Sequence, residues 1–133
     1  MGAADYVLIH DGARPFIKRE TIKKTLEVTK EKKACVVAVP VKDTIKIVID
    51  GKITDTPNRA NLWSAQTPQT FDYSLIKKAY DEAYKSNYYG TDDSMLVENI
   101  GQEVTMIMGS YENIKITSPE DLNMGEQILS LRK

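Results

Sequence analysis

Two short runs of apolar and β-branched residues, 5–10 and 34–41, constrain the fold more than any other feature of the sequence. Runs that are apolar almost throughout are typical of strands in a sheet whose two faces are both covered. The segment between them, residues 20–33, has apolar side chains at helical spacing and lysines at its C-terminal end. The order strand, helix, strand predicts a right-handed βαβ unit with parallel strands, and hence an α/β fold.

The first of these runs needs neighbouring strands, and only four residues precede it. Its partners must therefore come from later in the chain, from another chain, or from a segment that is missing. We expect the 133 residues to form a single domain, because this length suits one core better than two.

A β-hairpin is predicted after the second run. Residues 44–49 and 52–56 flank Asp50-Gly51, which is a strong signal for a two-residue turn. The hairpin carries charges and has little apolar surface for packing on its own domain. We therefore expect residues 42–58 to project outward as an arm.

The remaining elements follow from local signals. Pro68 argues against a central strand in 61–71, so a loop is expected there. In the last helix, which begins after a Ser118 cap, Leu122, Ile128 and Leu129 are expected to face inward. Further helices are predicted over 73–86 and 92–99, and a third strand over 104–108.

Composition excludes several classes of function. The net charge of −1 provides no basic field for binding a nucleic-acid backbone. No apolar stretch has the length of a membrane span and no signal peptide is evident, so a cytoplasmic location is expected. The single cysteine, Cys35, lies in an apolar run and is expected to be a small buried hydrophobe.

Asp11 and Arg14 directly follow the first predicted strand, where ligands collect in open α/β sheets. A carboxylate there would hold a cation or a hydroxyl group, and a guanidinium would hold a phosphate. A turn aspartate that pairs with a neighbouring arginine is an equally good interpretation. The only histidine, His10, has no nucleophile or second ligand nearby in sequence, which favours a structural role.

Other polar residues have two interpretations each. Thr44, Arg59 and Thr67 lie on or beside the hairpin and would suit an anionic, hydroxylated substrate, but exposed surface residues would look the same. Lys115, between two isoleucines, faces either a site or solvent. The Thr91-Asp92-Asp93 run favours a helix cap over a metal site. The sequence contains no glycine-rich phosphate loop, metal-spaced Cys/His set or nucleophile elbow.

Taken together, several motifs resemble the 2-C-methyl-D-erythritol 4-phosphate cytidylyltransferase family. They occur in the order found in that family and cover nearly the whole chain. The motifs are His10-Asp11-Gly12-Ala13-Arg14-Pro15-Phe16, Val39-Pro40-Val41-Lys42-Asp43-Thr44, Arg59 with Leu62-Trp63, Gln66-Thr67-Pro68-Gln69, and Asn113-Ile114-Lys115-Ile116-Thr117 with Pro119-Glu120-Asp121.

The resemblance implies a Rossmann-like, three-layer nucleotidyltransferase domain and a homodimer in which each arm reaches the active site of the partner. It implies an enzyme that transfers a cytidylyl group from CTP to 2-C-methyl-D-erythritol 4-phosphate. The products would be 4-diphosphocytidyl-2-C-methyl-D-erythritol, an isoprenoid precursor of the non-mevalonate pathway, and pyrophosphate. Mg²⁺ would be the cofactor. Such chemistry needs positioning and charge neutralisation and no covalent nucleophile.

By the same resemblance, Arg59 and Lys115 hold the acceptor phosphate for attack. Asp11 and Arg14 match positions near the reacting phosphates, and Thr44 and Thr67 match further substrate contacts. The partner's arm would deliver Thr44 and Arg59. Asp11 binds either the metal or the substrate, and the resemblance does not decide between them.

The departure from the family pattern is the missing glycine-rich loop that cradles the CTP phosphates. We therefore expect this chain to be the C-terminal part of such an enzyme and to be inactive alone. Ribitol-5-phosphate cytidylyltransferase is the alternative within the class, although Arg59 with Leu62-Trp63 favours methylerythritol phosphate. A non-catalytic dimerising fragment is the alternative from another class.

Overall fold

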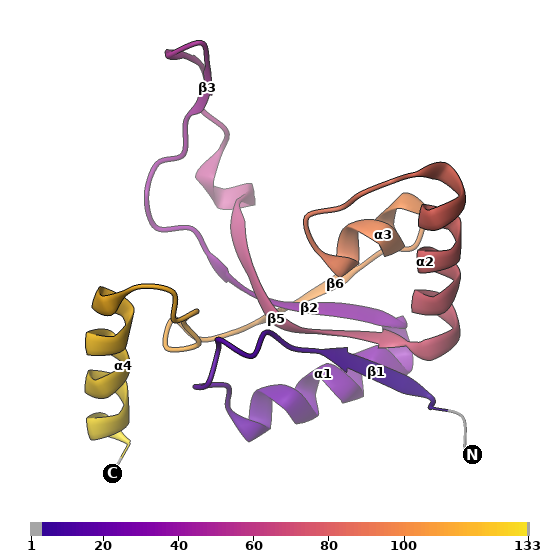
Figure 1. Cartoon of the computed structure of the whole chain (residues 1–133), viewed down its shortest axis with the longest axis horizontal. Helices are drawn as coiled ribbons and strands as arrows, with labels where there is room; N and C mark the ends of the chain where they lie inside the picture. Colours follow the sequence, from indigo (N-terminus) through magenta and orange to yellow (C-terminus); the bar gives the residue numbers. More distant parts are fainter. Residues whose placement is uncertain (1–3, 133) are drawn as a thin grey trace.

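The structure is a computed structural model that describes residues 4–132. It has an α/β architecture in which a mixed four-stranded sheet carries helices on its faces and a separate two-stranded hairpin projects from it (Figure 1). The main sheet consists of β1 (Tyr6–Ile9), β2 (Ala34–Pro40), β5 (Trp63–Asp72) and β6 (Thr105–Met108). The helices are α1 (Arg19–Lys32), α2 (Tyr73–Ser86), α3 (Asp93–Asn99) and α4 (Pro119–Leu131).

The strands lie in the order β1-β5-β2-β6. β1 and β2 each pair antiparallel with β5, and β2 pairs parallel with β6. β1 and β2 therefore run in the same direction, as predicted, but β5 separates them. The pairing partner of β1 in this structure is β5, which comes from later in the chain.

The prediction that Pro68 keeps residues 61–71 out of a central strand is wrong, because β5 occupies the middle of the sheet. Pairing with β1 ends at Gln69, and pairing with β2 shifts register between Val36 and Ala38. Pro68 lies within this irregularity, where no ladder hydrogen bond from its nitrogen is required.

The helices form layers on the two faces of the sheet. On one face the hydroxyl of Thr29 in α1 lies 3.4 Å from Cys35 Sγ. On the other face Ala34 and Phe71 pack with α2 and α3 in the main apolar core. Side chains of adjacent strand residues point to opposite faces, so each strand contributes to both layers. Burial raises the pKa of the Cys35 thiol, which agrees with the predicted role as a buried hydrophobe.

Helix ends follow their sequence signals. Ser118 caps α4 through a complete capping box with Asp121, and the Asp92 carboxylate accepts the backbone N–H of Met95 at the start of α3. The expected inward face of α4 is only partly correct. Ile128 is buried, whereas Leu122 and Leu129 are exposed. The buried face of α4 contains Gly125 and Ile128, and Gly125 lies against Phe16 and Ile116 from the loops that precede α1 and α4. No helix within residues 4–132 is long and apolar enough to cross a membrane.

The arm consists of β3 (Ile47–Ile49) and β4 (Lys52–Asp55), which form a sheet of their own. It extends away from the main sheet (Figure 1). The turn has positive φ at both Asp50 and Gly51, as a two-residue hairpin requires. All described side chains of the two arm strands are exposed, including the apolar ones.

Candidate functional site

The candidate site is built around the turn that follows β1. The Arg14 backbone N–H donates to the Asp11 carbonyl at 3.0 Å, which closes the turn. The Asp11 carboxylate accepts the Ala13 N–H at 2.9 Å, so the aspartate stabilises its own turn. The Asp11 N–H donates to Thr67 Oγ1 at 2.9 Å and ties the turn to the central strand β5.

Lys115 joins this turn from the loop between β6 and α4. Its ammonium lies 3.1 Å from Asp11 Oδ2, and the Ile116 N–H donates to the Ala13 carbonyl at 2.8 Å. The Ala13 N–H and the Lys115 ammonium hold the pKa of Asp11 below its usual range. The ion pair is open to solvent, with the lysine side chain 52% exposed, so an incoming anion can reach the ammonium.

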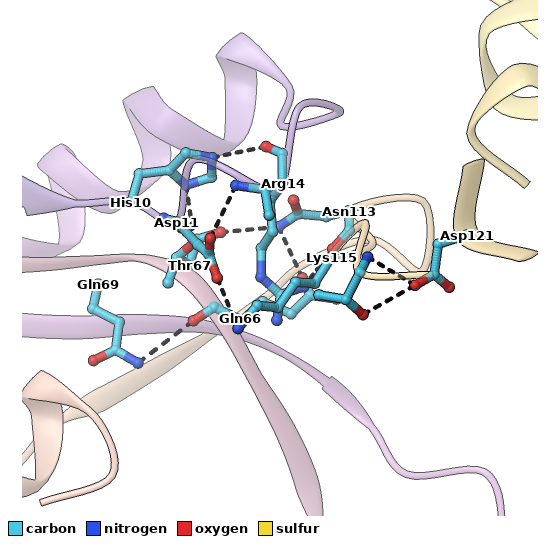
Figure 2. Close-up of polar contacts among 11 residues, drawn as sticks. His10, Asp11, Arg14, Gln66, Thr67, Gln69, Asn113, Lys115 and Asp121 are labelled. Atoms are coloured by element: carbon cyan, nitrogen blue, oxygen red, sulfur yellow. Dashed lines mark hydrogen bonds and ion pairs between the residues drawn. The ribbon is translucent and has the colours of Figure 1, made fainter. Parts of the chain in front are cut away.

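Arg14 reaches the same loop from the other side of the turn. Its Nη1 donates to the Asn113 carbonyl at 2.7 Å (Figure 2). Burial lowers the pKa of the Arg14 guanidinium and the nearby Asp11 charge opposes that effect, but an arginine remains charged at any physiological pH. Its Nε is buried and has no hydrogen-bond partner among the described residues.

The structure thus brings together four of the six predicted site residues, namely Asp11, Arg14, Thr67 and Lys115. We call these four residues the acid–base cluster. They come from three segments that are distant in sequence: the turn after β1, strand β5 and the loop before α4. His10 bridges the cluster, with Nδ1 3.0 Å from Thr67 Oγ1 and Nε2 2.9 Å from the Arg14 carbonyl, in agreement with a structural role.

The other two predicted residues lie outside the acid–base cluster. Arg59 begins the short helix η1 (Arg59–Asn61) at the base of the arm and is exposed. Its Nη1 donates to the Lys42 carbonyl at 2.6 Å, which anchors it to the first arm segment. Thr44 is exposed in the segment that leads into β3. Neither residue has a hydrogen bond to the cluster among residues 4–132.

Two buried amides support the cluster and were not predicted as site residues. Asn113 donates to Gln66 Oε1 and to the Thr67 carbonyl, and Gln66 donates to the Ser110 carbonyl. Asn113 stands in a motif noted in the sequence, but a buried amide has no local signature. Only the register of β5 and the path of the later loop bring these groups together.

The described residues do not fit a metal site. Among residues 4–132, no three His, Cys, Asp or Glu side chains gather closely enough to hold an ion. The Asp11 oxygens are already engaged by the Ala13 N–H and the Lys115 ammonium. A divalent cation of the Mg²⁺ or Ca²⁺ type takes several oxygen ligands, so Asp11 alone does not provide a site. The Asp92 carboxylate caps α3 and accepts from Gln69, which is the helix-cap role that the sequence favoured.

The geometry of the acid–base cluster suits a phosphorylated, hydroxylated ligand. An accessible ammonium and a fixed guanidinium provide positive charge, and a carboxylate and a threonine hydroxyl provide polar partners between them. A cavity of about 410 Å³ lies elsewhere, between α2 and α3, and none of its lining residues belongs to the cluster. The chemistry therefore points to the open cluster and not to this cavity.

Comparisons with known proteins identify the family of this chain. The sequence profile of the family described as IspD: 2-C-methyl-D-erythritol 4-phosphate cytidylyltransferase matches residues 1–131. The protein of that name from Clostridioides difficile is 70% identical over 129 residues, which are 97% of this chain and 54% of the relative. The Bacillus licheniformis protein of the same name is 53% identical over 99% of this chain and 57% of the relative.

Solved structures of the same family have a similar fold. The crystal structure of 4-diphosphocytidyl-2C-methyl-D-erythritol synthase from Anaerococcus prevotii superimposes with a TM-score of 0.88 at 39% identity, covering 96% of this chain and 57% of that chain. The 2-C-methyl-D-erythritol 4-phosphate cytidylyltransferase of Thermus thermophilus gives a TM-score of 0.86 at 32% identity, with 95% and 62% covered. The chain spans about half the length of the curated relatives it matches. It belongs to the 2-C-methyl-D-erythritol 4-phosphate cytidylyltransferase family.

Proposed function

We propose that this chain provides the acceptor-binding half of an enzyme that transfers a cytidylyl group from CTP to 2-C-methyl-D-erythritol 4-phosphate. The products would be 4-diphosphocytidyl-2-C-methyl-D-erythritol and pyrophosphate. The observation that carries the proposal is the convergence of Lys115 and Arg14 on the turn of Asp11, in a member of this family. The Lys115 ammonium and the Arg14 guanidinium, beside the accessible Asp11 carboxylate, suit the binding and orientation of a phosphate group.

In the proposed reaction, an oxygen of the acceptor phosphate attacks the α-phosphorus of CTP and pyrophosphate leaves. Lys115 would hold the acceptor phosphate through its ammonium, after exchanging part of its contact with Asp11 for the ligand. Arg14 would neutralise charge that develops between the phosphates, and Thr67 would orient a hydroxyl. The chain would contribute positioning and electrostatic stabilisation, the main sources of catalysis in phosphoryl transfer.

Arg59 and Thr44 enter this scheme from a second subunit. We propose a homodimer in which the exposed arm of one protomer carries both residues to the acid–base cluster of its partner. Two features support it: apolar side chains cover the arm without packing on their own domain, and Arg59 is anchored at the arm base. A two-fold dimer would place two arms and two clusters in equivalent pairs.

Mg²⁺ stays a prediction for the complete reaction, because enzymes use nucleoside triphosphates as magnesium complexes. We assign no residue of this chain to the metal, since both Asp11 oxygens already have partners. A cytoplasmic location of the activity likewise stays a prediction.

The test uses the C. difficile relative with the region that aligns with this chain replaced by the chain, which we call the hybrid enzyme. At 70% identity the two sequences are close enough for such a replacement. We expect CTP-dependent release of pyrophosphate with methylerythritol phosphate as acceptor. The 133 residues alone, which contain no glycine-rich phosphate loop, should release none.

The same assay separates the alternatives. Preference for ribitol 5-phosphate over methylerythritol phosphate would replace the proposed acceptor. A folded hybrid enzyme that uses neither acceptor, while the parent relative is active, would leave a non-catalytic dimerising role as the better account.

A further inference from the structure

Asn113 is a polar residue beside the acid–base cluster and is almost fully buried, at 2% exposed. Its amide nitrogen donates to Gln66 Oε1 at 3.1 Å and to the Thr67 carbonyl at 2.9 Å. A side-chain amide has two N–H donors, so both are used on β5. The loop before α4 is thereby fixed against the middle of the sheet at the strand position that carries Thr67.

The backbone of the same residue holds the other side of the cluster. The Asn113 carbonyl accepts Arg14 Nη1 at 2.7 Å, and its N–H donates to the Ser110 carbonyl at 3.0 Å. Lys115 follows two residues later and reaches Asp11. One residue therefore sets the spacing between a guanidinium, a threonine and an ammonium that come from three separate segments.

We propose that Asn113 is the positioning residue of the acceptor site, which fixes where Arg14, Thr67 and Lys115 stand relative to one another. The inference rests on the proposed function, because it assigns these three residues to one phosphorylated acceptor. Asn113 is itself covered by protein, so it acts through its neighbours and does not touch the ligand.

The chemistry of the position favours an amide over its close analogues. The two groups that face the Asn113 nitrogen are both carbonyl oxygens, so an ionised carboxylate there would meet two acceptors and repel them. Gly109 adds a constraint, because a Cβ at that position would lie 2.7 Å from Gln66 Oε1. The absence of a side chain at Gly109 therefore allows Gln66 Oε1 to lie close to this backbone segment.

The test compares Asn113→Asp and Asn113→Ser with the unsubstituted hybrid enzyme. We expect KM for methylerythritol phosphate to rise about tenfold or more, the change that corresponds to one lost buried hydrogen bond. KM for CTP should change less than about twofold, because the hydrogen-bond partners of Asn113 are Arg14, Thr67, Gln66 and Ser110. The proposed function places none of these residues against the cytidine or the leaving pyrophosphate. Asn113→Ser has an uncharged hydroxyl donor at this position and should show the smaller rise in KM. If Asn113→Asp does not fold, the Asn113→Ser variant still tests the proposal.

Thr25→Val is the matched control. Thr25 is fully buried and its hydroxyl donates to the Ile22 carbonyl at 2.7 Å, on the face of the sheet covered by α1. It should lower the melting temperature as the Asn113 variants do, yet leave both KM values unchanged.

Equal rises in both KM values, or a loss of stability with no change in KM for the acceptor, would overturn the positioning role. Either result in a hybrid enzyme that is active without substitution leaves the proposed function intact. An unsubstituted hybrid enzyme with no activity on methylerythritol phosphate would instead remove the proposed function and this inference with it.

Discussion

The acid–base cluster and the arm differ in how strongly the rest of the chain holds them. The cluster is held by hydrogen bonds between residues far apart in sequence, such as Arg14 to Asn113 and Asp11 to Thr67. The described side-chain hydrogen bonds of residues 44–56 stay within that segment, such as Lys46 Nζ to Thr56 Oγ1 and Thr54 Oγ1 to the Ile47 carbonyl. Contacts with the rest of the chain occur at the base of the arm, where the Lys42 ammonium lies over the Tyr111 ring. A single chain therefore fixes the geometry of the cluster, whereas it leaves the side chains of β3 and β4 exposed.

The contrast extends to burial. Asn113 and Gln66 are polar and buried beneath the cluster, whereas Val48 and Ile53 of the arm are apolar and more than half exposed. Buried amides need fixed partners, and exposed contiguous apolar groups mark interaction surfaces. We infer that the cluster is complete as a scaffold and that the arm acquires its packing from a second subunit.

The largest effect is expected from removing the solvent-accessible cation of the cluster, the Lys115 ammonium. Lys115→Met in the hybrid enzyme should lower kcat/KM for methylerythritol phosphate by about 100-fold, because an electrostatic clamp on a reacting phosphate is lost. Lys77→Met removes an equally accessible lysine whose ion pair is with Asp81 on the surface of α2, and should change the rate less than about twofold. Comparable losses in both variants would show that general surface charge, and not the cluster, drives the reaction.

A smaller effect, on assembly, is expected from the arm. Val48 and Ile53 are paired across the hairpin, and replacing both with aspartate puts charge on the apolar side of the arm. We expect the hybrid enzyme to shift from dimer to monomer by light scattering, with a smaller loss of activity than Lys115→Met and little change in melting temperature. Lys52→Gln, on the same arm, should leave the dimer intact. A doubly substituted protein that stays dimeric would contradict the role assigned to the arm.

The smallest effect concerns pH. The pKa of Asp11 is lower in the fold than in the unfolded chain, so its contribution to stability is present above the unfolded pKa of about 4 and is lost as pH falls through the folded pKa. Asp11→Asn keeps an acceptor for the Ala13 N–H but loses the charge. Its melting temperature should be slightly below that of the unsubstituted protein near pH 7, and the gap should close as the pH falls below about 4. A gap that widens in acid would show that the Lys115 pair does not stabilise the fold.

Local signals predicted the helices and the arm well. A capping serine, a proline at the first helical position and an Asp-Gly turn act over a few residues, so Ser118 and Asp50 were informative by themselves. The residues of the acid–base cluster were each predicted as candidate site residues. Only the fold shows that their segments lie next to one another. Their roles came from the family resemblance, because spacing alone left Asp11 and Arg14 equally well explained as a turn pair.

The missed features depend on distant parts of the chain. Pro68 argued correctly against regular pairing at its own position, but the irregularity opposite Val36 and Ala38 lets the rest of β5 remain central. Likewise, nothing near Asn113 in sequence indicates that Gln66 and Thr67 lie beside it. The outward position of Leu122 and Leu129 also depends on how α4 packs, which helical spacing does not determine.

Mixing two inactive variants of the hybrid enzyme tests most directly whether arm and cluster act across subunits. Arg59→Ala and Lys115→Met homodimers would each be defective, but after subunit exchange a mixed dimer would pair the intact arm of one chain with the intact cluster of the other. With random exchange half of the dimers are mixed and each regains one of two sites, so about a quarter of the original activity should return. Activity that stays at the level of the separate variants, although mass measurements show mixed dimers, would contradict the exchange of arms.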